Sequence, residues 1–208
     1  MQLRPMSVVD HNIVREYFEQ NRFLVRQVRK SGVPSRKKAG EEEISLLVHN
    51  PAYQPGERKP DFLLFASELR YIHRAVVIVT DWPTSRLTAA MLKSSLHLFR
   101  FLEKTVLKRV GEWMPPEPGN SEKREPLMKI LVLPGLPTAE PFRTQSAELL
   151  RKEGIDGIIS FRSMLVDVIG RVEVNRVYQN SEVLEVIRLL KKHDLLNTSQ
   201  MELFDRPP

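Results

Sequence analysis

The segment at residues 74–82 constrains the fold more than any other part of the chain. It holds an unbroken apolar run, residues 75–79, which ends in a polar residue, an acid and a tryptophan. A run of this length is far too short to cross a membrane, and it is typical of a strand that is buried on both faces. Such strands lie in the centre of α/β sheets, between layers of helices. The sequence therefore predicts an α/β protein with this segment as a central strand.

A predicted helix and two predicted strands precede this central strand. Asp10 can cap a helix over residues 10–20, along which apolar side chains recur at spacings of three and four. Residues 23–29 and 42–51 are rich in the aliphatic and β-branched residues that favour strands. A shorter strand-like piece is expected at residues 61–65.

The segment that follows the central strand is predicted to form one long helix over residues 83–110. Its apolar residues share one side of that helix, namely Leu92, Leu96, Phe99, Leu102, Val106 and Val110. A proline-rich loop at residues 114–127 then leads to a fourth predicted strand at residues 128–133.

The C-terminal third is predicted to contain both helices and short extended segments. The predicted helices lie at residues 141–153, 163–170 and 181–193, and the extended segments at residues 155–160 and 172–177. We expect residues 1–135 to form the core, residues 136–196 to form an α/β extension packed on the same domain, and residues 197–208 to form a loose tail.

The composition narrows the chemistry that the chain can perform. Its 208 residues include no cysteine, which excludes disulfides, thiolate metal ligands and a thiol nucleophile. The first residues lack the apolar stretch of a secretory leader, and no apolar run approaches a membrane span, so we expect a cytoplasmic protein with no membrane partner. The net charge of +6 favours an acidic partner such as nucleic acid.

Three segments resemble the PD-(D/E)XK, or restriction-endonuclease-like, nuclease superfamily. Residues 13–25 are similar to the opening helix of many such domains and the Phe-x-Val strand that follows it. Residues 43–51 resemble the family's second strand, acid-Ile-Asp-Leu-Leu-x-x-x-Pro, and residues 77–82 resemble its third, Val-Glu-Val-Lys-Gly-Trp. The resemblance spans residues 10–135 and implies a central mixed sheet flanked by helices, in the order helix, three strands, long helix, strand.

The resemblance also implies which residues would carry catalysis. In this family an Asp and a Glu hold Mg²⁺, and a Lys two residues after the Glu points to the same side of its strand and acts on the attacking water. The Asp falls on Ser45, the Glu on Ile78 and the Lys on Thr80. Serine and isoleucine cannot hold Mg²⁺ as a pair of carboxylates would. We therefore expect a nuclease-like fold without catalytic residues and without a cofactor.

An alternative is an active Mg²⁺-dependent nuclease whose acids have moved to other positions. Asp61 lies ahead of the third strand, and Asp81 ends that strand. Glu16 and Glu19 lie on the first predicted helix, from which some family members supply an acid. Since isolated acids are mostly exposed side chains, all four are also explained as surface residues.

Two groups of basic residues are candidates for contact with nucleic acid. The first recurs at steps of three and four along the predicted long helix: Lys93, His97, Arg100, Lys104 and Lys108. The second surrounds the loop after the first strand: Arg26, Arg29, Lys30, Arg36, Lys37 and Lys38. A cationic stripe can follow phosphates and release their counterions, although a solvated helix face has the same pattern.

These observations support one leading hypothesis and two alternatives. The leading hypothesis is a catalytically inactive nuclease-like protein that binds double-stranded DNA, or serves as a structural module of a DNA-processing complex with other subunits or a second copy as partners. The alternatives are the active nuclease with moved acids, and a protein-interaction scaffold that binds no nucleic acid. DNA retention that falls steeply with salt separates the first hypothesis from the scaffold.

Overall fold

The computed structural model describes residues 8–29, 44–56, 58–79, 89–107 and 127–196. The strands of these residues form a five-stranded sheet in the order β1-β2-β3-β4-β5. Their bounds are β1 Leu24–Arg29, β2 Ile44–His49, β3 Arg74–Val79, β4 Met128–Leu133 and β5 Gly157–Ser160. The pairs β1–β2 and β2–β3 are antiparallel, whereas β3–β4 and β4–β5 are parallel. The predicted α/β class and mixed sheet are confirmed.

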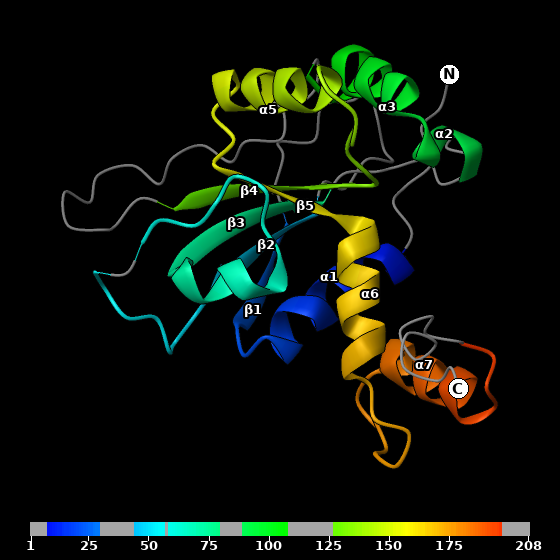
Figure 1. Ribbon diagram of the computed structural model, residues 1–208. Coiled ribbons are helices and arrows are strands. Elements are labelled where there is room, and N and C mark those ends of the chain that lie inside the picture. Colours follow the sequence, from blue (N-terminus) through cyan, green and yellow to red (C-terminus); the bar gives the residue numbers. More distant parts are fainter. Residues whose placement is uncertain (1–7, 30–43, 57, 80–88, 108–126, 197–208) are drawn as a thin grey trace, which may run out of the picture.

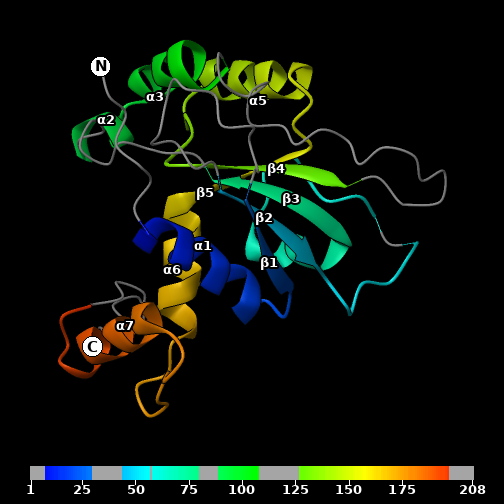
Figure 2. The same cartoon turned by 180° about the vertical axis from the view of Figure 1, so that it is seen from behind.

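Helices cover both faces of the sheet, as Figures 1 and 2 show from opposite sides. On one face, the α1/α6 face, lie α1 Val8–Gln20 and α6 Phe161–Arg171, and α7 Glu182–Lys192 packs against α1. On the other, the α3/α5 face, lie α2 Ala89–Lys93, α3 Ser95–Phe101, the π-helix η2 Leu102–Val106 and α5 Phe142–Lys152. Within the described segments, no helix is both long enough and apolar enough to span a membrane.

Strand β3 is buried on both faces, as its unbroken apolar run predicts. Residues 75–79 are each 7% exposed or less. Because side chains alternate along a strand, Val77 and its alternate neighbours pack on the α1/α6 face, in a cluster with Phe18 of α1 and Met164 of α6. Val76 and Ile78 pack on the α3/α5 face. Both helical layers therefore pack against apolar side chains of this strand.

The prediction of one continuous helix after β3 is wrong over residues 89–107. Helix α2 ends at Lys93, and Ser94 has an extended backbone with φ −99° and ψ 111°. Its side-chain oxygen then accepts a hydrogen bond from the backbone nitrogen of His97 and caps α3. Serine favours this capping position over a helix interior because its hydroxyl competes for backbone hydrogen bonds.

The break at Ser94 changes which side chains of this region are buried. Leu98 is buried, whereas Leu92 and Leu96 are 39% and 38% exposed. Leu102 and Val106 are buried as the apolar spacing predicts, although the intervening backbone is a π-helix. The predicted row of buried apolar side chains is therefore found only in the C-terminal half of residues 89–107.

The strand-like piece predicted at residues 61–65 extends the sheet beyond β5. The backbone nitrogen of Leu64 donates to the carbonyl of Ile158 at 2.9 Å, and the nitrogen of Ile158 donates to the carbonyl of Phe62 at 2.8 Å. A side chain at position 157 would force Leu64 to move, since a Cβ there would lie 2.6 Å from Cδ1 of Leu64. The extended segment predicted at residues 172–177 is wrong, because these residues form irregular structure with a turn.

Candidate functional site

The two positions that the resemblance assigns to family carboxylates lie directly opposite each other in the sheet. The register of β2 and β3 pairs Ser45 with Ile78, and Ile78 in turn pairs with Leu131 of β4. Thr80, the third position, lies outside the described residues. The backbone positions 45 and 78 are thus close enough for two carboxylates, one at each position, to reach the same ion.

The side chain of Ile78 is part of the hydrophobic core. It is 3% exposed and belongs to a cluster on the α3/α5 face with Leu102 and Val106 of η2 and Leu131 and Leu133 of β4. A charged carboxylate at this position would lose its hydration to an apolar surrounding. Ile78 therefore serves packing and cannot bind a metal.

Of the three candidate acids that the structure describes, Glu16 is the most buried. It is 8% exposed on α1 and forms a side-chain hydrogen bond with Ser181, the residue that caps α7. Burial raises the pKa of the Glu16 carboxyl, and the nearby Glu19 adds to this, while Ser181 and Arg15 oppose it. The Glu16 carboxyl therefore links α1 to the start of α7 through Ser181.

The other two candidate acids that the structure describes, Glu19 and Asp61, each lie beside an arginine. Glu19 pairs with Arg15 at 2.9 Å, and Asp61 is 67% exposed with a carboxylate oxygen 3.7 Å from a nitrogen of Arg58. Among the residues that the structure describes, no three histidine or acidic side chains gather as a metal-binding group. Asp81 lies outside the described residues, so a site that includes it stays a prediction.

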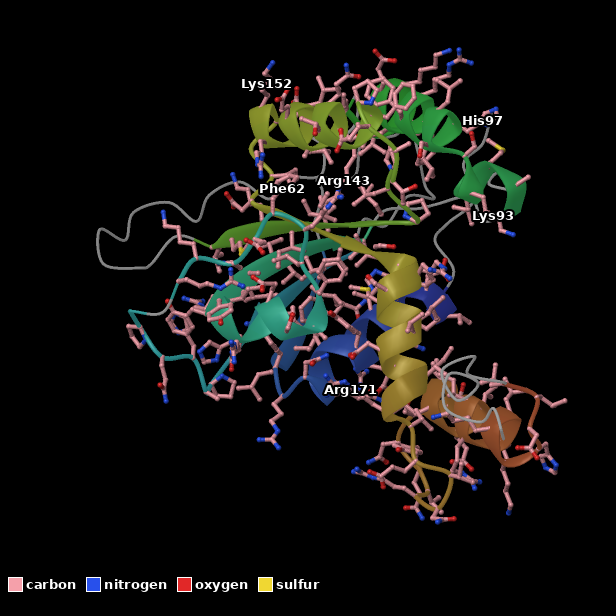
Figure 3. The ribbon with its side chains drawn as sticks, viewed as in Figure 1. Phe62, Lys93, His97, Arg143, Lys152 and Arg171 are labelled. Carbon is pink, nitrogen blue, oxygen red and sulfur yellow. The ribbon has the colours of Figure 1, made fainter. Side chains whose placement is uncertain are left out.

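The first group of basic residues is exposed on the helices above the α3/α5 face. Lys93 ends α2, His97 and Arg100 lie in α3, Lys104 lies in η2, and all four are exposed. The break at Ser94 places Lys93 on a separate helix from the other three residues, which share the continuous helical stretch of α3 and η2. We call Lys93, His97, Arg100 and Lys104 the basic row. Figure 3 shows Lys93 and His97 at the opposite end of this layer from Lys152.

The second predicted group of basic residues falls almost entirely outside the described residues. Arg29 ends β1, and only its backbone is described. The remaining members of the loop group, Lys30, Arg36, Lys37 and Lys38, belong to the segment that is not described, and so does Lys108 of the first group. Their contact with nucleic acid stays a prediction.

Sequence reasoning missed a groove on the α3/α5 face, at the β1 edge of the sheet. It has a volume of about 470 Å³ and contains four side chains that carry or can carry positive charge: Arg26, His49, His73 and Arg74. Apolar residues complete the lining: Leu24, Val25 and Leu47. Alternation along β2 places His49 on the same side as Leu47, but only the register of β1 and β2 adds Arg26 to that side.

A second feature missed from the sequence is the buried carboxylate of Glu68 in the 3-10 helix η1, Ala66–Tyr71. Glu68 is 6% exposed, forms an ion pair with Arg58, and accepts a hydrogen bond from the backbone nitrogen of Asp61 at 3.0 Å. These contacts fix the connection between β2 and β3 on η1. Only the tertiary arrangement identifies them, because the three residues lie in a segment without periodicity.

Comparison with known protein families, with curated proteins and with solved structures finds no match to this chain.

Proposed function

We propose that this protein is a catalytically inactive member of the PD-(D/E)XK superfamily that binds double-stranded DNA. The observation that carries the proposal is the pairing of Ser45 with Ile78. The resemblance assigns these two residues to catalytic acids from sequence segments 33 residues apart (78 − 45). In an active site both acids must reach one metal ion, which requires neighbouring strands with this register.

The order and direction of the elements give further support to the superfamily assignment. Helix α1 precedes the antiparallel strands β1, β2 and β3, and the helices α2, α3 and η2 connect β3 to the parallel strand β4. This is the order that the resemblance implies, with a helical region that is broken at Ser94 within residues 89–107 in place of one long helix. The C-terminal strand β5 and its helices are additions to that core.

The apolar surroundings of Ile78 support the proposed loss of catalysis. An ion-binding site needs oxygen ligands on the sheet, whereas Ile78 fills its position with a side chain packed against Leu102, Val106 and Leu131. Burial of this side chain contributes about 2 kcal/mol to folding through the hydrophobic effect. The position thus has a structural role that a glutamate could not take over.

The proposed contact with DNA rests on charge that is exposed on one layer of helices. The basic row presents Lys93, Arg100 and Lys104 to solvent, together with His97. The whole chain has a net charge of +6, which adds a non-specific attraction to phosphate. Cations exposed along such a helical layer can contact phosphates of a duplex.

A combined assay of DNA binding and cleavage, with and without Mg²⁺, tests the proposal. We expect a blunt duplex to be retained at low salt in both conditions and to remain intact in the presence of Mg²⁺. The variant Lys93→Gln/Arg100→Gln/Lys104→Gln should bind about tenfold more weakly or worse, because each lost phosphate contact removes a released counterion. A cut duplex would contradict the loss of catalysis.

A matched control separates the basic row from total charge. The variant Lys152→Gln/Arg162→Gln/Lys192→Gln removes the same charge at three other exposed positions, on α5, α6 and α7. It should retain most of the wild-type affinity. Equal losses in the two triple variants would show that DNA responds only to net charge and would contradict an interface at the basic row.

A further inference from the structure

The groove at the β1 edge concentrates positive charge on one face of three strands. Cross-strand pairing places Leu24 of β1, His49 of β2 and Arg74 of β3 in one row. The next row on the same face contains Arg26 and Leu47. Directly opposed side chains lie about 5 Å apart, so His49 and Arg74 are neighbours. Arg26 lies one row further along, opposite Leu47, and its long side chain lines the same groove.

The charge in this groove is not balanced by its own lining. Among the described residues that line it, none is acidic. The ion pairs of the described part of the chain involve other arginines, so Arg26 and Arg74 have no ion-pair partner there. A phosphate that accepts hydrogen bonds from both guanidinium groups would balance this charge.

The size and walls of the groove indicate more than a bare phosphate. Its volume of about 470 Å³ is that of a small-molecule site rather than of a single ion. Leu24, 63% exposed, and Leu47 provide apolar surface beside the cations. At the other side, the ring of His73 stacks on Tyr53 at 4.8 Å and lies 5.3 Å from the ring of His49. Such a mixture suits a phosphate joined to a sugar and a flat base.

The groove is distinct from the positions that the resemblance assigns to catalysis. Arg74 and His49 lie four residues along their strands from Ile78 and Ser45, respectively (78 − 74 and 49 − 45). At about 3.3 Å per residue, this separation is about 13 Å. A ligand in the groove would therefore not occupy the positions of the family carboxylates.

We infer that this groove binds a nucleoside phosphate, with Arg26 and Arg74 on the phosphate and the Leu24–Leu47 surface against the sugar and base. The ligand is either a free mononucleotide or one nucleotide unit of a single strand. This inference does not depend on the proposed duplex contact at the basic row, which lies on the helices rather than on β1 and β2.

Titration of the full chain with deoxyadenosine monophosphate and with a ten-residue oligothymidylate tests this site. We expect at least one of the two to bind, and the variant Arg26→Gln/Arg74→Gln to weaken that binding about tenfold or more. The two ligands distinguish the two sources, since a free nucleotide site binds both, whereas a strand site binds the oligonucleotide alone. Deoxyadenosine and inorganic phosphate, as the separate halves of the ligand, should each bind more weakly than the mononucleotide or the oligonucleotide.

Two further variants keep the test independent of folding. Leu24→Glu places an acid in the groove at an exposed position and should weaken binding at least as much as the double variant. Lys152→Gln/Arg162→Gln removes the same charge outside the groove and should change the affinity less than about twofold. The assignment is overturned if neither nucleotide ligand binds, if inorganic phosphate or deoxyadenosine binds as tightly, or if the control loses as much affinity as the groove variants.

Discussion

At the scale of single residues, Ile78 has the clearest consequence for chemistry. It lies at the position that the resemblance assigns to a glutamate, and it is 3% exposed, packed with residues of β4 and η2. We predict that Ile78→Val costs about 1 kcal/mol of unfolding free energy, the usual effect of one missing buried methyl group. Ile78→Glu should cost several times more, because a carboxylate without a partner would be buried. Urea unfolding of the two variants measures both values.

The same position tests whether the proposed family side chains can give activity. A variant with Ile78→Glu and Thr80→Lys introduces two of the three side chains that the resemblance assigns to catalysis, but the glutamate would enter an apolar cluster. We expect it to show no Mg²⁺-dependent cleavage of DNA. If the variant were as stable as the wild type and cleaved a duplex, Ile78 would not be committed to packing.

Glu16 provides a prediction of pH dependence at the residue scale. Burial raises the pKa of its carboxyl in the folded state, so the folded protein holds this proton more tightly than the unfolded chain does. Its stabilising contribution is complete below the unfolded pKa of about 4.3 and is lost as the pH rises through the raised folded pKa. Glu16→Gln is neutral throughout, so its stability relative to wild type should increase between about pH 4 and about pH 8.

Thermal or urea unfolding at both ends of that range measures the effect of Glu16. The variant Glu19→Gln makes the same change of charge on the same helix, at an exposed residue paired with Arg15, and serves as the control. A Glu16→Gln variant that differs from wild type by the same amount at both ends would contradict the role of burial.

At the scale of elements, Ser95 connects α3 to the segment after β4. Its Oγ lies 3.1 Å from the backbone nitrogens of both Thr138 and Ala139 and accepts a hydrogen bond from each. We predict that Ser95→Ala lowers the unfolding free energy by about 1–2 kcal/mol, because both donors lose their protein acceptor. Ser67→Ala, at an exposed serine of η1, is the matched control and should have a smaller effect in the same unfolding experiment.

The elements also show how far the sequence alone predicts the fold. Strand β3 and strand β4 were predictable because an apolar run between polar residues fits a buried strand and little else. The helix after β3 was predicted with the wrong continuity, since apolar spacing continues across residues 89–107 while Ser94 caps a new helix. The spacing of apolar residues indicates which side chains are buried. It does not detect a serine hydroxyl that takes a backbone hydrogen bond and ends one helix before the next begins.

At the scale of the whole molecule, the two helical layers cover the sheet unequally. The apolar cluster of the α3/α5 face extends from β3 to β5, with Leu47 of β2 at its margin. The groove lies at the β1 and β2 end of the same face. The sequence could not predict this groove, because Arg26, His49 and Arg74 come together only through the register of three strands. It could predict the basic row, because those residues are close in the sequence.

The salt dependence of duplex binding tests the central claim most directly. If the basic row contacts phosphates, a plot of log affinity against log salt should be steep for wild type, with a slope of about −0.9 for each phosphate neutralised. In the variant Lys93→Gln/Arg100→Gln/Lys104→Gln, the slope should be smaller in magnitude by about three. A slope that does not change in this variant, or a wild-type protein that retains no duplex even at low salt, would contradict DNA binding by the basic row.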